Sequence, residues 1–212
     1  MSVTGVALIL FLTFHMSMNI AALFSGEAYN MICEFLGANW YALVATLGLA
    51  ALAVIHIIYA FWLTMQNRKA RGNERYAVTT RPAGVEWSSQ NMLVLGIIII
   101  LGLLLHLFNF WYNMMFAEFT GITVAHDPAD GYAYIVDTFA CPVYVVLYIV
   151  WIVALWFHLT HGFWSAMQTF GWSGKTWFCR WKVIGIVYST LLCLGFLVVV
   201  LWFAAKGLCG CC

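Results

Sequence analysis

The chain has 212 residues, of which 65% are hydrophobic and only 8% are charged, with a formal net charge of +1. A soluble domain usually has about 25% charged residues, so this composition excludes an ordinary soluble enzyme and indicates an integral membrane protein. The nearly neutral charge gives no reason to expect a nucleic-acid partner.

Five uncharged segments each exceed the roughly 20 residues that a helix needs to cross a membrane. They cover residues 1–26, 35–67, 87–117, 138–174 and 183–205. The segments lack the period-two alternation of membrane-spanning strands. We therefore predict an all-α membrane protein with one membrane domain over residues 1–212. Its predicted transmembrane helices cover about 2–24, 40–66, 91–116, 142–170 and 183–205.

The connections between these helices follow in chain order. The first segment has no basic residue before it, unlike a cleaved signal peptide, so we expect it to remain as the first helix. The loop 26–39 leads to the second helix, and the longer loop 67–84 leads to the third. The loop 118–137 precedes the fourth helix, where Pro142 suits the first turn because its missing N–H would be unpaired there. The short loop 171–180 precedes the fifth helix.

The charged residues predict the orientation of the chain. Eight of the nine basic residues lie in two of the loops: Arg68, Lys69, Arg71, Arg75, Arg81, Lys175, Arg180 and Lys182. The positive-inside rule makes these loops cytoplasmic, so we expect the N-terminus inside and the C-terminus outside. Most acidic residues then fall in the outer loops: Glu27, Glu34, Glu118, Asp127, Asp130 and Asp137.

The seven cysteines form no clear redox or metal motif. Cys33, Cys141, Cys179 and Cys193 are scattered, and we interpret them as packing residues, a role that free cysteine fills well. The tail CGCC at 209–212 is denser. A disulfide or a metal site there stays open, and a frayed chain end is the simpler interpretation.

Each of the first four apolar segments carries a histidine. They are His15 in FLTFHMSMN, His56 in LAVIHIIYAF, His106 in LGLLLHLFNFWYN and His158 in VALWFHLTHGFWSAMQ. An imidazole in an apolar span is costly unless something satisfies its ring, so each is a functional-site hypothesis. His15 and His106 lie about 15 Å from the outer helix ends, and the other two lie at a similar distance from the inner ends. The two levels differ by on the order of 10 Å, which predicts two pairs of axial haem ligands.

Residues near these histidines favour a pocket at each level. Asn19, Asn109 and Asn113 follow helical spacing from the outer histidines, which predicts an outer pocket with polar groups. Gly102 and Gly162 would leave room for a flat macrocycle, although ordinary close packing of helices explains such glycines equally well.

Two other histidines have different interpretations. His161 lies about one turn nearer the cytoplasm than His158, so it either replaces His158 as a ligand or bonds a haem propionate, and we favour the propionate. His126 lies in an outer loop and is assigned no ligand role.

Two alternatives to haem remain for the span histidines. They could form hydrogen bonds between helices, or they could bind zinc or non-haem iron, since HLTH places two imidazoles on one helix face. Such metal sites usually need further ligands, and neither pair has a carboxylate or cysteine at matching depth. Bis-imidazole haem needs only two histidines, so it fits best.

The histidine strings, together with HIIYAFWLTMQNRKARGN and FHLTHGFWSAMQTFGW, resemble a known family over nearly the whole chain. The family is the cytochrome b membrane anchor of diheme (B-type) succinate:quinone oxidoreductases and menaquinol:fumarate reductases, most closely its Bacteroides-like members. The resemblance implies a bundle in which the first four helices hold two haem b groups. His56 and His158 would bind the proximal haem, and His15 and His106 the distal haem.

The same resemblance implies a function in the bacterial cytoplasmic membrane. The chain would transfer electrons between menaquinone or menaquinol and a cytoplasmic iron–sulfur subunit, which works with a flavoprotein subunit that carries FAD. The lipid bilayer and the quinone complete its expected partners, and dicarboxylate chemistry would not occur on this chain. Glu34 would accept a proton at the quinone site, since such a step needs a base within hydrogen-bond reach. Some relatives have a glutamate where this chain has Trp156, which argues against their transmembrane proton path here.

Two other functions stay open at this point. One is a diheme anchor of another quinone-linked enzyme, such as a formate dehydrogenase or a hydrogenase. Co-purification with an FAD protein would distinguish it. The other is a transporter that uses buried histidines for protons or metal ions. Transporters often have internal repeats and broken helices, and the sequence shows neither.

Overall fold

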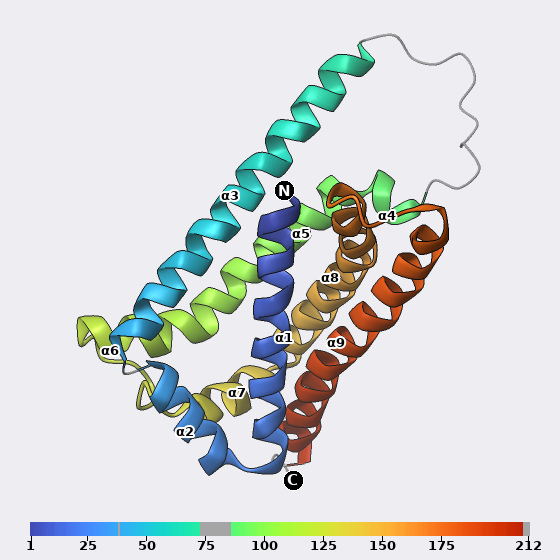
Figure 1. Ribbon diagram of the computed structural model, residues 1–212. Helices are drawn as coiled ribbons and strands as arrows, with labels where there is room; N and C mark the ends of the chain where they lie inside the picture. Colours follow the sequence, from blue (N-terminus) through green and yellow to red (C-terminus); the bar gives the residue numbers. More distant parts are fainter. Residues whose placement is uncertain (38, 73–85, 210–212) are drawn as a thin grey trace.

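The structure is a computed structural model that describes residues 1–37, 39–72 and 86–209. Helices form all the regular elements of the described residues, and Figure 1 shows their arrangement. In chain order they are α1 (Ser2–Phe24), α2 (Gly26–Gly37), α3 (Trp40–Arg71), α4 (Trp87–Gln90), α5 (Met92–His106), the π-helix η1 (Leu107–Phe116), α6 (Ala117–Thr120), α7 (Gly131–Ala140), α8 (Pro142–Thr169) and α9 (Lys175–Cys209).

Five helical segments are long and apolar enough to cross a membrane, which confirms the predicted number and class of spans. They are Ser2–Phe24, Trp40–Ala70, Met92–Thr120, Pro142–Thr169 and Lys175–Leu208. The third span joins α5, η1 and α6 into one continuous rod. The chain is therefore an all-α, multi-pass membrane protein.

Four predicted helix ends are wrong. α3 continues past residue 66 to Arg71, and the third span continues past residue 116 to Thr120. α9 begins at Lys175 instead of near residue 183 and ends at Cys209 instead of near residue 205. The reason is that a helix satisfies its own backbone and need not end where its apolar stretch ends. Long basic side chains at its ends can extend into water.

The two predicted outer loops contain helices that the sequence analysis missed. α2 and α7 are short and amphipathic, with Tyr29 buried on α2 and Ile135 buried on α7. The Asp130 carboxylate accepts a hydrogen bond from the Ala133 N–H at 3.1 Å and so caps α7. The Asn30 side chain on α2 donates to the same carboxylate at 2.7 Å, so the two helices are fastened together.

The core lies where α8 and α9 run side by side, with α1 packed against both (Figure 1). Phe203, Leu192 and Ile135 are among its most buried side chains. α3 contacts α1, α2 and α5 but packs loosely, since Ala42 is its only buried residue among those that the structure describes. His56 therefore lies on a helix whose surface is mostly exposed outside the bundle.

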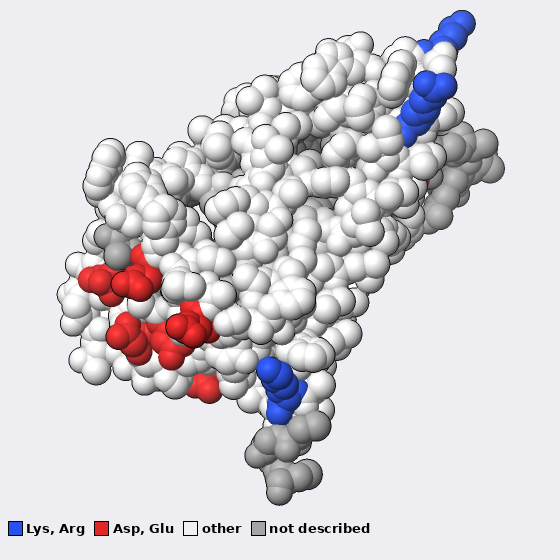
Figure 2. All heavy atoms as spheres, turned by 60° about the horizontal axis from the view of Figure 1, so that its bottom comes forward, with Lys and Arg blue, Asp and Glu red and all other residues white. Residues whose placement is uncertain are grey.

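The two ends of the bundle differ in charge. Acidic side chains gather at the end formed by α2, α6 and α7, which we call the acidic end (Figure 2). α1 begins and α9 ends at opposite ends, as an odd number of spans requires. We call the end where α1 begins the basic end, because Arg68, Lys69, Lys175, Arg180 and Lys182 lie on the helix ends there. Arg75, Arg81 and the tail cysteines Cys211 and Cys212 lie outside the described residues. The predicted orientation in the membrane stays a prediction.

Candidate functional site

The four span histidines meet in space as two pairs. The rings of His15 on α1 and His106 at the end of α5 lie 5.6 Å apart, centroid to centroid, at an interplanar angle of 85°. The rings of His56 on α3 and His158 on α8 lie 6.4 Å apart at 62°. We call these the acidic-end pair and the basic-end pair. They are the same pairs that depth along the sequence predicts, and each joins two different spans.

The two pairs lie at different heights in the bundle. A Cβ at Gly5 would be 3.5 Å from Cε1 of His56, which places the basic-end pair beside the start of α1. His15 follows Gly5 by ten residues on that helix, a rise of about 15 Å. On α8, Trp151 contacts the acidic-end pair, and His158 follows seven residues later, a rise of about 10 Å. The separation agrees with the expected order of 10 Å.

A hydrogen bond to Thr4 orients one ring of the basic-end pair. The Thr4 hydroxyl lies 3.0 Å from Nδ1 of His56 and donates its proton to the Met1 carbonyl at 2.8 Å. A hydroxyl has only one proton, so Nδ1 of His56 must be the donor to the Thr4 oxygen. The tautomer then leaves the lone pair of Nε2 free, and a metal-binding imidazole needs such an arrangement.

The other ring of this pair belongs to His158. Its Nδ1 atom is buried and has no hydrogen-bond partner among the described residues. Four residues later, a Cβ added at Gly162 would meet nothing within 4 Å. The predicted room beside Gly162 is therefore present.

Aromatic packing surrounds the acidic-end pair. The His106 ring contacts Phe110 at 5.1 Å, Trp151 at 5.6 Å and Tyr148 at 6.3 Å. Its Nδ1 is buried without a hydrogen-bond partner among the residues that the structure describes. The space beside Gly102 is filled by the indole of Trp151, which would lie 2.1 Å from an added Cβ. The prediction that Gly102 leaves room for a macrocycle is therefore wrong, because this glycine makes room for an indole.

A cavity of about 730 Å³ opens beside the acidic-end pair. Both histidine rings line it, together with Phe110 and Trp151. Toward the acidic end its lining includes Glu34, Glu118 and Asp127. Ligand pockets typically measure about 300–1,000 Å³, so this one can hold a cofactor-sized molecule. The cavity connects the histidine pair with carboxylates at the acidic end.

The geometry of both pairs fits a haem iron held between two imidazoles. Metal–imidazole bonds are about 2.0 Å long, so two rings on opposite sides of one iron have centres about 6 Å apart. The observed separations are 5.6 and 6.4 Å. Within the described ranges, no group of three or more His, Cys, Asp or Glu side chains is placed to hold a metal ion. The ring separations suit a group that brings its own remaining ligands, as haem does.

Glu34 lies on α2, exposed at its surface, and lines the cavity. In the part of the chain that the structure describes, its carboxylate makes no hydrogen bond or ion pair. Tyr29 and Cys33 line the cavity from the same helix. Burial raises the pKa of Cys33 to about 11 and raises the pKa of Tyr29, so both are neutral near pH 7. Glu34 thus supplies the carboxylate that α2 presents to this cavity, and its role stays a prediction.

The three asparagines predicted to line the outer pocket make different contacts in the structure. Asn19 lines the cavity and accepts a hydrogen bond from the Tyr29 hydroxyl at 3.3 Å. Asn109 is buried and donates to the hydroxyl of Tyr148, which lines the cavity, at 3.3 Å. Asn113 instead donates to carbonyl oxygens of its own helix at 3.0 and 3.1 Å. Asn113 is not among the residues that line the cavity, so the pocket role predicted for it is wrong.

His161 belongs to a separate cluster at the basic end. Its Nδ1 lies 3.5 Å from the Glu86 carboxylate, which also accepts from the Trp164 indole at 3.3 Å and pairs with Lys182 at 2.8 Å. Burial raises the pKa of Glu86, but Lys182, His161 and Trp164 together lower it further, and the net pKa lies below its ordinary value. Sequence reasoning missed Glu86. The only signal was an acidic residue directly before a span, at the end of a mostly basic loop.

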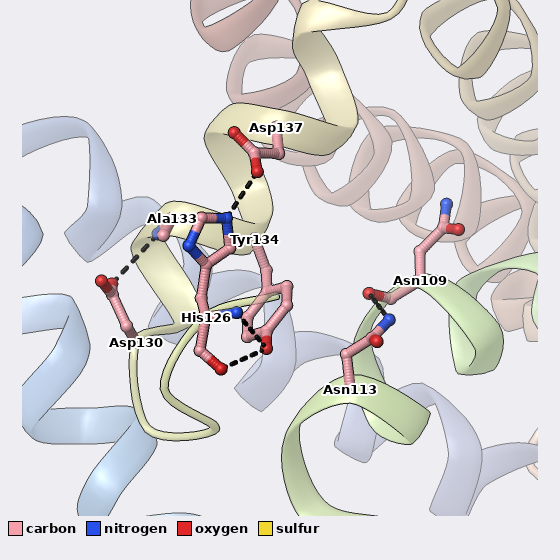
Figure 3. A network of polar contacts seen from close by, with 7 residues as sticks. All are labelled: Asn109, Asn113, His126, Asp130, Ala133, Tyr134 and Asp137. Carbon is pink, nitrogen blue, oxygen red and sulfur yellow. Dashed lines mark hydrogen bonds and ion pairs between the residues drawn. The ribbon is translucent and has the colours of Figure 1, made fainter. Parts of the chain in front are cut away.

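His126 lies away from both pairs, in the loop before α7. Its Nε2 is 2.5 Å from the Asp137 carboxylate, and its carbonyl accepts from the Tyr134 hydroxyl at 2.8 Å (Figure 3). The contact between His126 and Asp137 holds the loop against α7. The assignment of no ligand role to His126 stays a prediction.

Trp156, which the family resemblance places where some members have a glutamate, connects α8 to α9. Its indole N–H donates to the Thr190 hydroxyl at 2.9 Å. This bond satisfies the only polar atom of the side chain. Trp156 therefore has a structural role between two spans.

Four cysteines of the described residues are free thiols: Cys33, Cys141, Cys179 and Cys193. Cys193 is buried in the core, as expected of a packing residue. Cys179 is exposed near the start of α9, so the packing interpretation is wrong for it. It lies on a stretch predicted as a loop and found to be helix, which turns its side chain outward.

The chain matches no model of a known protein family, no curated protein and no solved structure. The family resemblance of the histidine strings therefore stays a prediction. The function proposed below rests on that resemblance and on the geometry of the two histidine pairs.

Proposed function

We propose that this protein is the membrane anchor of a quinone-linked redox complex and holds two haem b groups, one at each histidine pair. One observation carries the proposal. Four histidines from four different spans meet as two pairs with ring separations of 5.6 and 6.4 Å. Hydrogen bonding between helices explains this poorly, because Nδ1 of both His106 and His158 is buried without a partner among the described residues.

The chain's own residues divide the work between holding the cofactors and handling protons. Bound haem iron gains and loses one electron at a time and would conduct electrons between the two heights of the bundle. The two histidine pairs, about 10–15 Å apart along the helices, would hold these groups. Thr4 fixes the tautomer of His56, so that Nε2 is available as a ligand.

The cavity at the acidic end supports a quinone site in this proposal. A quinol that becomes a quinone releases two electrons and two protons. Glu34 lines the same cavity as His15 and His106, so a quinol there would have a proton acceptor and an electron acceptor beside it. Glu34 would take one of the two protons at its carboxylate as the quinol is oxidised, and the other would pass to water at the acidic end. By the family resemblance the substrate is menaquinol or menaquinone.

The partners are proposed from the opposite end. The basic end would face the cytoplasm by the positive-inside rule and would dock an iron–sulfur subunit that works with an FAD-carrying flavoprotein subunit. This makes the chain the anchor of a succinate:quinone oxidoreductase or a menaquinol:fumarate reductase. Fumarate or succinate would react on those partners. The membrane would be the bacterial cytoplasmic membrane.

Purification from native membranes in mild detergent tests this function. We expect a reduced-minus-oxidised spectrum of haem b, reduction of that haem by an added naphthoquinol, and an FAD protein that co-purifies. Haem that a quinol reduces, accompanied by a partner without FAD, would support an anchor of another quinone-linked dehydrogenase instead. Haem that no quinol reduces would contradict the quinone site.

A further inference from the structure

The indole of Trp151 lies along one face of α5, and His106 belongs to that face. The indole N–H donates to the Ile99 carbonyl at 3.1 Å. The ring passes over Gly102 and contacts the His106 ring at a centroid distance of 5.6 Å. Residues 99, 102 and 106 are three and four apart, so they share a helix face. We call these three residues of α5 the Trp151 seat.

Glycine is required at the middle of the seat. A Cβ at Gly102 would lie 2.1 Å from Cδ1 and 2.2 Å from Cγ of Trp151. These atoms are at the base of the indole. Because the indole is hydrogen-bonded to the Ile99 carbonyl and packs against Tyr148 at a centroid distance of 5.6 Å, the ring cannot rotate away freely. Closely packed interiors do not absorb such an overlap without movement. A methyl group here must displace the indole.

Packing, and not hydrogen bonding, orients the His106 ring. Its buried Nδ1 has no hydrogen-bond partner among the described residues, whereas Nδ1 of His56 is bonded to Thr4. The rings packed against His106 are Phe110 from the adjoining η1, Trp151 and Tyr148 from α8, and His15 from α1. Of these, only Trp151 is fastened to α5 itself by a hydrogen bond.

We propose that Trp151, seated on Gly102, is a positioning residue that sets the ring orientation of His106. The inference rests on the proposed function to the extent that His106 is an axial ligand of haem. Outer-shell partners orient metal-binding imidazoles and tune the metal, and here an aromatic ring replaces the usual hydrogen bond. A change in the Trp151 seat should therefore alter haem binding at the acidic-end pair and not at the basic-end pair.

The substitution Gly102→Ala tests the seat in the purified full-length chain with its partners. We expect retention of the acidic-end haem to weaken by about tenfold and its low-spin electron paramagnetic resonance signal to shift, with the basic-end signal unchanged. Gly96→Ala is the matched control, since it lies on the same helix and a Cβ there meets nothing within 4 Å. Two unchanged signals, or equal changes in both, would overturn the proposal.

A second variant covers the case in which Gly102→Ala does not fold. Trp151→Phe keeps an aromatic ring but loses the bond to Ile99, so we expect a smaller shift of the acidic-end signal alone. If both signals stay at their wild-type positions in Trp151→Phe, the indole does not position His106.

A fluorine measurement separates the seat from the haem. Trp151→Phe assigns the Trp151 resonance in chain labelled with 5-fluorotryptophan. Without haem, that resonance should move in both Gly102→Ala and His106→Leu. If the wild-type chain binds no haem, the proposed function is wrong. A Trp151 resonance that moves in the two variants would still support the Trp151 seat. A resonance that does not move would overturn the seat itself.

Discussion

The two histidine pairs hold their rings by different means. In the basic-end pair, Thr4 bonds to His56 at 3.0 Å and fixes its tautomer. In the acidic-end pair, the His106 ring is enclosed by aromatic side chains, and the pair lines a cavity of about 730 Å³ that reaches carboxylates. Neither ring of the basic-end pair lines that cavity.

This difference suggests that the two histidine pairs have different roles. A ring fixed by a hydrogen bond suits a cofactor whose task is only to pass electrons. A ring held by packing, beside a ligand-sized space, suits a cofactor that must also contact a substrate. The comparison is open to test because single substitutions reach each pair separately.

The largest expected effect comes from removing one histidine of a pair. His106→Leu should abolish haem binding at the acidic-end pair and His158→Leu at the basic-end pair, and each should lower the haem content by about half, since a bis-imidazole site needs both rings. The pyridine haemochrome assay measures the content per chain. His126→Ala, a surface histidine bonded to Asp137, should retain all of it. Full haem content in either Leu variant would break the assigned pairing.

The second prediction concerns Glu34, which should matter for quinol and not for haem. Glu34→Gln removes the proton acceptor, so we expect quinol-dependent haem reduction to slow by about a hundredfold. Stopped-flow absorbance at the haem band measures the rate. Glu27→Gln is the matched control, since Glu27 lies on α2 but does not line the cavity. Equal rates in the two variants would remove Glu34 from the quinone site.

The third prediction sharpens the contrast in how the rings are held. Thr4→Val removes the partner of His56 Nδ1, and we expect retention of the basic-end haem to weaken by about tenfold. Thr64→Val is the control, because Thr64 bonds only to the Ala60 carbonyl of its own helix. Haem transfer to apomyoglobin measures retention. Faster loss of the acidic-end haem in Thr4→Val would mean that the two pairs are not separately tuned.

The smallest expected effect lies at the Glu86 cluster. The folded-state pKa of Glu86 is below its ordinary value of 4.5, so its ionised form stabilises the fold above that pH. The contribution is lost as the pH falls below 4.5 and through the folded-state pKa. We expect Glu86→Gln to cost roughly 0.5 kcal/mol at pH 7, because the pair with Lys182 is partly exposed.

Thermal unfolding in detergent from pH 7 down to pH 3 measures this difference. The gap in Tm between wild type and Glu86→Gln should narrow in the acid part of that range. Glu27→Gln, which removes a carboxylate without an ion pair among the described residues, should show no such gap. A gap of constant size would mean that the charge of Glu86 does not stabilise the fold.

The spans and the pairing of the histidines could be predicted because one physical rule governs each. A membrane requires long apolar helices, and a fixed rise per residue converts position along a helix into height. α2 and α7 could not be predicted in this way. They are short and amphipathic, and their helical form depends on packing against the bundle, as the buried Tyr29 and Ile135 show.

Contacts between distant segments were also beyond sequence reasoning. The bond from Thr4 to His56 joins residues 52 positions apart, and the indole of Trp151 reaches Gly102 from another span. Gly102 shows the limit clearly. A missing side chain predicts that something comes close, but the fold decides whether that is a cofactor or an indole.

The pyridine haemochrome assay on the purified complex, scaled to chain concentration by amino-acid analysis, tests the central claim most directly. Two haem b groups per chain are predicted, one for each histidine pair. A correctly assembled protein without haem would contradict the account, and one haem per chain would show that one of the two pairs is not a haem site.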